Sequence, residues 1–265
     1  MRRSARSLVR RLTAVAVLVG LVAAAAPYAQ RRYGQSDGYY GNVQYDGKFT
    51  FVRMSYNFTL RSRRGFQSEP PWAHDYPYGE HSFLKILTAV SNVPAHVDET
   101  SIMTFSDPEM FKFPVIYLVE PGFWQMSDSD VVGLRSYLLK GGFLIVDDFP
   151  GGGRFGDAWP QFDSQMSRVF PEGRWIEITI DHPMFHSFYE IDPHEVPQSY
   201  EMGGAPQFWA LFEENDPNRR MLVIANYRND LSEFWEYVEK GMSPTPETNE
   251  SYKVGINQFI YGITH

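Results

Sequence analysis

The fold is decided by residues 114–149, which read PVIYLVEPGFWQMSDSDVVGLRSYLLKGGFLIVDDF. Residues 114–120 and 143–146 are apolar runs bounded by proline or glycine, a pattern typical of strands buried on both faces of a parallel sheet. Between them, Ser127 begins a helix and a glycine pair ends it. A helical crossover of this kind joins parallel neighbouring strands. The stretch therefore predicts a βαβ unit.

The same alternation of strands and helices extends to both sides of this unit. Residues 49–56 carry β-branched and aromatic side chains in near-alternation with polar ones, which indicates a first strand. Further strands are expected at 95–99, 175–180 and 221–225, and further helices at 81–90, 230–240 and 252–261. Strands that alternate with helices predict an α/β fold of three layers with a mainly parallel sheet.

The N-terminal residues have the pattern of a secretory signal peptide. Residues 1–11 hold five arginines and no acid, and residues 12–26 are almost wholly apolar and end in four alanines. A basic head, a short apolar core and small residues mark a chain for export. We therefore expect a signal peptide at 1–29. The alternative is an uncleaved N-terminal anchor, which would then be the only part of the chain in contact with a membrane.

The rest of the chain divides into two segments. Residues 30–48 are rich in glycine, tyrosine and polar side chains, which indicates a flexible linker. Residues 49–265 are long enough for one large folded domain. We expect this domain to reside in the periplasm or elsewhere in the cell envelope.

The composition excludes several classes of function. The 265 residues include no cysteine, which rules out a cysteine nucleophile, thiolate metal sites and disulfides. The net charge of −8 becomes −13 once the five N-terminal arginines are removed. Because nucleic-acid phosphates require a positive surface, we expect no nucleic-acid partner, and an envelope protein or glycan instead. No P-loop or dinucleotide fingerprint is present, so the cofactor is left unassigned.

Acids and imidazoles follow several of the expected strands. In three-layer α/β folds, ligands bind outside the carboxyl ends of the strands, so these residues are the candidates for a site. The catalytic candidates are Asp147, Asp148, His74 and His182. The candidates for ligand binding are Asp75, Glu80, Glu120, Trp72 and Trp124, and those for metal binding are Asp148 and His182.

Each group also has a structural interpretation. Because side chains alternate along a strand, one of Asp147 and Asp148 can face the cleft while the other caps the following turn. His182 precedes a proline, so its imidazole can serve as a turn residue bonded to backbone. His74 and Asp75 lie in a loop rich in tryptophan and proline, which they can pin to the domain.

Five short motifs occur in an order that resembles the bacterial family called domain of unknown function 4159. They are Phe51-Val-Arg-Met-Ser-Tyr56, Trp72-Ala-His-Asp-Tyr-Pro77, Gly141-Gly-Phe-Leu-Ile-Val-Asp-Asp-Phe149, Arg168-Val-Phe-Pro171 and Asp181-His-Pro183. The resemblance implies a class I glutamine amidotransferase-like fold, a flavodoxin-like sandwich. In amidotransferases of that fold a cysteine occupies the turn where this chain has Asp147 and Asp148. Without a thiolate no acyl intermediate forms, so amidotransferase activity is excluded.

Two functions remain open. One is an exported, non-catalytic binding or assembly module of the cell envelope, built on an amidotransferase-like scaffold. The other is an envelope hydrolase, with or without a metal, that acts on a glycan or peptide through Asp147, Asp148, His74 and His182. Loss of the nucleophile favours the first, and the gathering of acids and histidines favours the second.

Overall fold

The structure, a computed structural model, describes residues 42–58, 70–198, 202–238, 241 and 244–265. The expected signal peptide at 1–29 and most of the expected linker lie outside these residues, so both stay predictions. Within the described residues, no helix is both long enough and apolar enough to cross a membrane.

Seven strands of the described chain form one sheet in the order β2-β1-β3-β4-β7-β6-β5. The strands are β1 (Val52–Met54), β2 (Ser101–Met103), β3 (Val115–Val119), β4 (Phe143–Phe149), β5 (Ile176–Glu177), β6 (Gln207–Phe212) and β7 (Met221–Tyr227). The five strands from β2 to β7 in this order pair in parallel, whereas β6 pairs antiparallel with both β7 and β5. The sheet is thus mainly parallel, as predicted.

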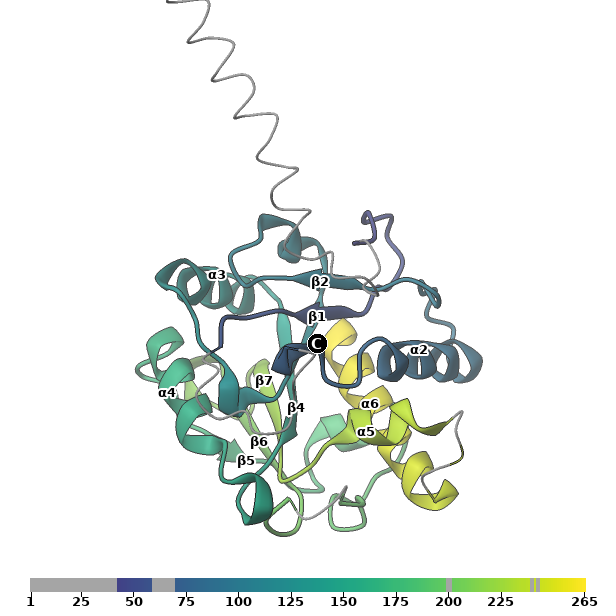
Figure 1. Cartoon of the computed structure of the whole chain (residues 1–265). Coiled ribbons are helices and arrows are strands. Elements are labelled where there is room, and N and C mark those ends of the chain that lie inside the picture. The colour runs from purple at the N-terminus through teal and green to yellow at the C-terminus, as the bar shows by residue number, and fades with distance from the viewer. Residues whose placement is uncertain (1–41, 59–69, 199–201, 239–240, 242–243) are drawn as a thin grey trace, which may run out of the picture. The chain divides into compact units, whose positions relative to one another are not determined.

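Helices cover both faces of the sheet and make a three-layer, flavodoxin-like sandwich (Figure 1). The helices are α2 (Tyr78–Val90), α3 (Asp128–Leu139), α4 (Trp159–Val169), α5 (Leu231–Glu236) and α6 (Thr245–Thr264). Short 3-10 helices are η2 (Pro71–Ala73), η3 (Pro108–Lys112), η4 (Pro121–Phe123), η5 (Gly153–Phe155), η6 (Pro183–His186) and η7 (Glu213–Asn215). Figure 1 shows α3 and α4 on one face, and α2, α5 and α6 on the other.

Two hydrophobic clusters lie between these layers, one on each face of the sheet. Successive residues of β4 alternate between them: Phe143 and Ile145 pack with the α2, α5 and α6 side, and Leu144 and Val146 with the α3 and α4 side. Burial on both faces explains why the strand is an unbroken apolar run rather than an alternating one.

The predicted βαβ unit is confirmed. β3 pairs with β4 in parallel from Val115 opposite Phe143 to Val119 opposite Asp147. Ser127 caps α3, and its side chain and that of Asp130 each accept a hydrogen bond from the other's backbone N–H. This reciprocal capping fixes the start of the crossover helix.

Other expected elements differ from the structure. The expected strand at 95–99 is wrong, because Ala95 makes only an isolated bridge to Phe49 and β2 lies further along the chain. The helix expected at 252–261 begins already at Thr245. The sequence patterns do not predict strand β6 or helix α4. They therefore also miss the antiparallel edge of the sheet, which β6 forms with β7 and β5.

The folded unit begins at Asn42, before the expected domain start at residue 49. The Asn42 side chain donates to the Ile102 carbonyl at 2.9 Å and accepts from the Ile102 N–H at 2.7 Å. The Val43 N–H donates to the Ser101 hydroxyl at 3.0 Å. These bonds occupy the outer edge of β2, so residues 42–48 pack on the domain rather than forming part of a flexible linker.

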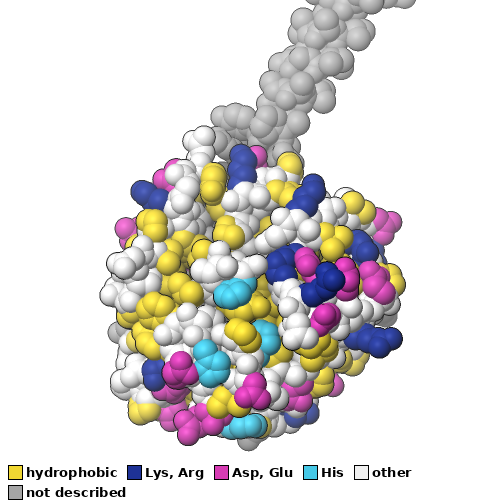
Figure 2. Space-filling model, turned by 180° about the vertical axis from the view of Figure 1, so that it is seen from behind, with side chains coloured by type: hydrophobic (Ala, Val, Ile, Leu, Met, Phe, Trp, Pro, Cys, Tyr) yellow, Lys and Arg dark blue, Asp and Glu magenta, His cyan; other side chains and the backbone are white. Residues whose placement is uncertain are grey.

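Charges of both signs share the outer surface. On the face shown in Figure 2, Lys and Arg side chains lie beside Asp and Glu side chains. Exposed ion pairs include Arg168 with Asp128 at 2.9 Å and Arg135 with Glu172 at 2.8 Å. The acids described next differ from these because most of them are buried.

Candidate functional site

The candidate site lies at the carboxyl ends of the parallel strands, at the edge where the strand order reverses. From β1 the chain crosses to β2 on one side and then returns to β3 on the other side of β1. Ligands of doubly wound folds bind at such a reversal. A cavity of about 530 Å³ lies at this edge. Acidic and imidazole side chains line it, together with the apolar side chains of Phe123, Phe155 and Met202. The acidic and imidazole residues are His74, Glu120, Asp148, Asp157, Asp230 and Glu233.

His74 and Asp148 form an ion pair in this cavity, as the sequence allowed. His74 Nδ1 lies 2.9 Å from Asp148 Oδ2, and the imidazole is 30% exposed. Burial alone would favour the neutral ring, but the hydrogen bond to Asp148 and the charges of Asp75, Asp148 and Glu120 raise the pKa of His74 to about 10. The ring therefore favours its cationic form at neutral pH.

Backbone conformation turns Asp148 toward the cavity. Its φ of 49° lies in the left-handed region, and the pairing of β4 with β7 shifts register between Val146 and Phe149. Asp75 and Glu120, which follow β1 and β3, also have positive φ, at 64° and 52°. Non-glycine residues in this conformation are uncommon and cluster at functional sites.

Asp147, the neighbouring carboxylate, has a structural role. It is fully buried and accepts hydrogen bonds from the Tyr117 hydroxyl, the Asn226 amide and the backbone N–H groups of Leu231 and Ser232. Burial raises its pKa to about 6, although these donors favour the charged form. Asp147 thus anchors the start of α5 and does not line the cavity, so its candidate catalytic role is not supported.

A layer of buried polar groups lies behind the ion pair. The Ser232 hydroxyl lies 2.8 Å from Asp75 Oδ2 and 3.1 Å from Asp230 Oδ1. Asp230 also caps α5 by accepting from the Glu233 N–H at 3.0 Å. Burial, more than any neighbouring charge, raises the pKa of both Asp75 and Asp230 well above the usual range for a carboxyl.

Glu80, a candidate for ligand binding, is instead half of a buried ion pair. Its carboxylate accepts a hydrogen bond from Arg53 Nε, and both side chains are fully buried. Arg53 Nη1 also donates to the carbonyl of His74 at 2.9 Å and lies 3.4 Å from that of Trp72. The pair therefore supports the loop that carries His74.

The two candidate tryptophans do not line the cavity. Trp124 is fully buried and packs against Phe105 and Phe162 at ring-centroid distances of 5.4 and 6.1 Å. Trp72 is partly buried against the same hydrophobic cluster. The aromatic residues that line the cavity in the described part of the chain are Phe123, Phe155 and Tyr237.

His182 lies at the opposite edge of the sheet, so the structure does not support its candidate roles in catalysis and metal binding beside Asp148. Its ring lies 5.6 Å from that of Phe212, which pairs with Met221 at the start of β7. His182 Nδ1 accepts from the Met184 N–H at 3.2 Å and caps η6. Burial, with a smaller contribution from His265, lowers the pKa of His182 to about 4. It is the turn residue that the structural interpretation describes.

Among the charged and phenolic residues that line the cavity, sequence reasoning missed Asp157, Asp230, Glu233 and Tyr237. The signal was present, because Asp230 follows a strand expected at 221–225 and so belongs to the same edge as Asp148. Asp230 also lies three residues before Glu233 at the expected start of a helix, and this spacing of two acids predicts a helix N-cap.

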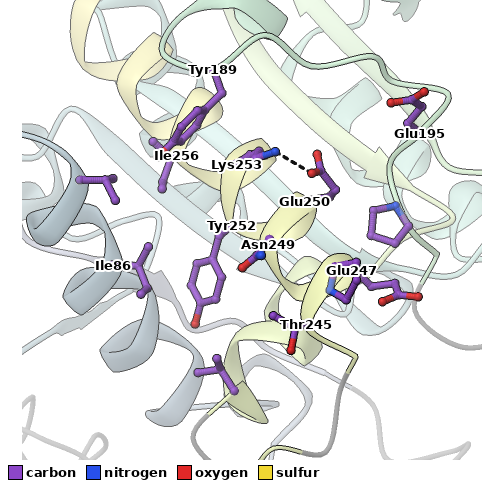
Figure 3. A pocket seen from close by; sticks show the side chains of 14 residues that line it. Ile86, Tyr189, Glu195, Thr245, Glu247, Asn249, Glu250, Tyr252, Lys253 and Ile256 are labelled. Atoms are coloured by element: carbon purple, nitrogen blue, oxygen red, sulfur yellow. Dashed lines mark hydrogen bonds and ion pairs between the residues drawn. The ribbon is translucent and has the colours of Figure 1, made fainter.

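A second groove, of about 800 Å³, runs between α2 and α6 (Figure 3). Ile86, Tyr252 and Ile256 line it together with the Lys253–Glu250 ion pair, whose atoms lie 2.6 Å apart. Among the described residues no histidine lines it, and its walls come from α2, α6 and loops rather than from strand ends. The cavity with His74 is therefore the better candidate, although the groove is larger.

Comparison with protein families identifies the family of this chain. The family model described as domain of unknown function (DUF4159) matches residues 50–263, which span nearly all of the folded unit. This agrees with the resemblance seen in the five motifs. No match was found among curated proteins.

Proposed function

Because the chain belongs to the DUF4159 family, whose description names no activity, we propose from its own geometry that it is an exported binding module of the cell envelope. In this proposal the cavity at the carboxyl edge holds a small ligand without covalent chemistry. Export follows from the arginine-rich head and apolar run at residues 1–26.

The observation that carries the proposal is the make-up of the cavity wall. A volume of about 530 Å³ suits a small molecule or the end of a glycan or peptide. The His74–Asp148 pair and Glu120 can hydrogen-bond hydroxyl and amide groups. Phe155, whose side chain is exposed, can pack against an apolar face of the same ligand. An envelope glycan or peptide end carries both kinds of group.

The absence of a hydroxyl, thiol or amine nucleophile of the serine, threonine, cysteine or lysine type supports binding over acyl-transfer catalysis. No serine, threonine or lysine lines the cavity in the described part of the chain, and the sequence has no cysteine. The nearby Ser232 hydroxyl is fully buried and bonded to Asp75 and Asp230. The chain's acidity also supports a partner other than nucleic acid.

The test is a titration of the full chain with soluble peptidoglycan fragments by isothermal calorimetry, once with EDTA and once with Mn²⁺. We expect saturable binding, weakened at least about tenfold by Asp148→Asn, which removes the partner of His74. His182→Gln is the matched control and should bind like the wild type. Absence of binding by the wild type in both buffers would overturn the proposal.

A second candidate, an envelope hydrolase, is favoured by one observation. Ligand atoms of His74, Asp148 and Asp230 all lie within 4.8 Å of one another, close enough to act on one bond or one metal ion. The raised pKa of Asp230 also suits a proton donor. Turnover of fluorogenic glycosides or peptides by the wild type, lost in Asp230→Asn, would establish this candidate over simple binding.

Export has a separate test. Mass spectrometry of the protein from its native host should find a mature N-terminus between residues 26 and 30. An intact N-terminus on cytoplasmic protein would contradict export but leave the cavity's function untouched.

A further inference from the structure

We propose that His74, Asp148 and Asp230 form a site for a divalent transition-metal ion at the floor of the cavity. This inference rests on the proposed ligand-binding function and deepens it. The ion would provide a positive centre to which oxygen atoms of the ligand bind.

The three side chains converge from separate parts of the fold. His74 follows η2, Asp148 lies near the end of β4 and Asp230 caps α5. His74 Nδ1 and Asp148 Oδ2 are 2.9 Å apart, and all three ligand atoms lie within 4.8 Å of one another. Donors about 2.1 Å from an octahedral ion are about 3 Å apart when adjacent and about 4.2 Å apart when opposite. The observed spacing is therefore close to that of a metal ion's ligands.

An independent observation comes from Asp75, whose side chain is fully buried beside this cluster. Its Oδ2 accepts from the Ser232 hydroxyl at 2.8 Å. Its Oδ1 lies 3.6 Å from His74 Nδ1, and no donor among the described residues makes a hydrogen bond to it. Because a buried carboxylate oxygen without a hydrogen-bond donor is costly, a metal ion held beside His74 would stabilise Asp75 at this point.

The surroundings hold the donors in place. Asp230 Oδ1 is bonded to the Glu233 N–H and to the Ser232 hydroxyl, which fixes the carboxylate from the α5 side. Arg53 Nη1 donates to the His74 carbonyl and fixes the loop on the other side. Rigid surroundings of this kind orient metal ligands and raise their affinity.

The donor set indicates which ion fits. One imidazole nitrogen with carboxylate oxygens and no thiolate suits Mn²⁺ or Zn²⁺, whereas Ca²⁺ takes six to eight oxygen ligands. Three protein ligands leave coordination positions open. His74, Asp148 and Asp230 all line the cavity, so these positions face the space in which the ligand would lie.

The experiment uses Mn²⁺ alone, added to the full chain after dialysis against a chelator, with free Mn²⁺ measured by electron paramagnetic resonance. We expect one saturable Mn²⁺ per chain. Asp148→Asn and Asp230→Asn should each weaken binding at least about tenfold, and Asp75→Asn about 10- to 100-fold, as for groups that orient metal ligands. His182→Gln should not change binding, because that ring lies at the other edge of the sheet.

A measurement on the wild type guards against variants that fail to fold. Mn²⁺ relaxes nearby nuclei, so substoichiometric Mn²⁺ should broaden the ring resonances of His74 and leave those of His182 sharp. No saturable binding, equal loss of binding in His182→Gln, or a sharp His74 ring at one equivalent would each overturn the metal site. The calorimetric titration in EDTA contains no free metal, so a failed metal site and a failed ligand site give different results.

Discussion

His74 and His182 both stand next to an aspartate in the sequence, yet the fold makes opposite use of them. At the carboxyl edge, the bond to Asp148 and nearby carboxylates raise the pKa of His74 to about 10. At the amino edge, burial lowers the pKa of His182 to about 4. The adjacent aspartate does not distinguish the two histidines, because the hydrogen bond from His74 to Asp148 and the burial of His182 depend on segments far along the chain.

The difference has a structural basis at each edge. His74 Nδ1 faces the carboxylate of Asp148 near the end of β4, in a cavity lined by four further acids among the described residues. His182 Nδ1 faces the Met184 N–H, so it has to be an unprotonated acceptor, and its ring lies near those of Phe212 and Tyr261. An imidazole nitrogen that accepts a hydrogen bond from an N–H favours the neutral ring, which lowers its pKa. A nearby carboxylate favours the protonated ring, which raises its pKa.

The largest expected effect comes from breaking the buried support of the carboxyl edge. Arg53→Met leaves Glu80 buried without its partner and removes a bond to the His74 loop, so we expect a loss of about 3–5 kcal/mol in the free energy of unfolding. Urea denaturation measures this loss. The double variant Arg53→Met, Glu80→Gln should recover part of it. Lys112→Met, which breaks an exposed ion pair with Glu109, should have little effect.

A smaller effect should separate the two neighbouring aspartates. Asp147→Asn places an amide NH₂ among four donors, so it should lower the free energy of unfolding by about 1–3 kcal/mol. Asp148 faces the cavity, so Asp148→Asn should lower the free energy of unfolding less than Asp147→Asn does. It should weaken ligand and metal binding instead. Thermal unfolding of the two variants side by side measures the contrast. Equal stability losses would show that both carboxylates are structural.

The smallest expected effect is the pH dependence of stability that His182 causes at the amino edge of the sheet. Because the pKa of His182 is lower in the folded protein than its ordinary 6.5, the unfolded chain binds more protons between about pH 6.5 and 4. Its stabilising contribution is therefore complete above pH 6.5 and declines as the pH falls through this window. His182→Asn keeps a capping oxygen but cannot titrate, so it should flatten stability against pH there.

His182→Ala tests the cap itself. Loss of the acceptor for the Met184 N–H should cost about 0.5–2 kcal/mol at pH 7. Denaturant unfolding at pH 7 and pH 5 distinguishes the cap from the titration. Equal pH profiles for wild type and His182→Asn would contradict the assigned environment of this ring.

The sequence by itself determined the central architecture and the edge that carries the site. The apolar runs that became β3 and β4, the serine cap of α3 and the crossover between them follow from short-range sterics, capping and burial, which local patterns report. Once those strands were parallel, the rule for strand ends pointed to His74, Glu120 and Asp148, and all three line the cavity.

Tertiary structure alone decided which polar residues meet there. His74 and Asp148 are 74 residues apart, and Asp75 and Ser232 are 157 residues apart, so no local pattern reports their contact. The register shift in β4 directs Asp148, and not Asp147, toward the cavity. The antiparallel strand β6 ends beside His182 at the opposite edge of the sheet. Local sequence sets the conformation of each segment, but the neighbours of a side chain depend on how distant segments pack, and its neighbours set its charge and its role.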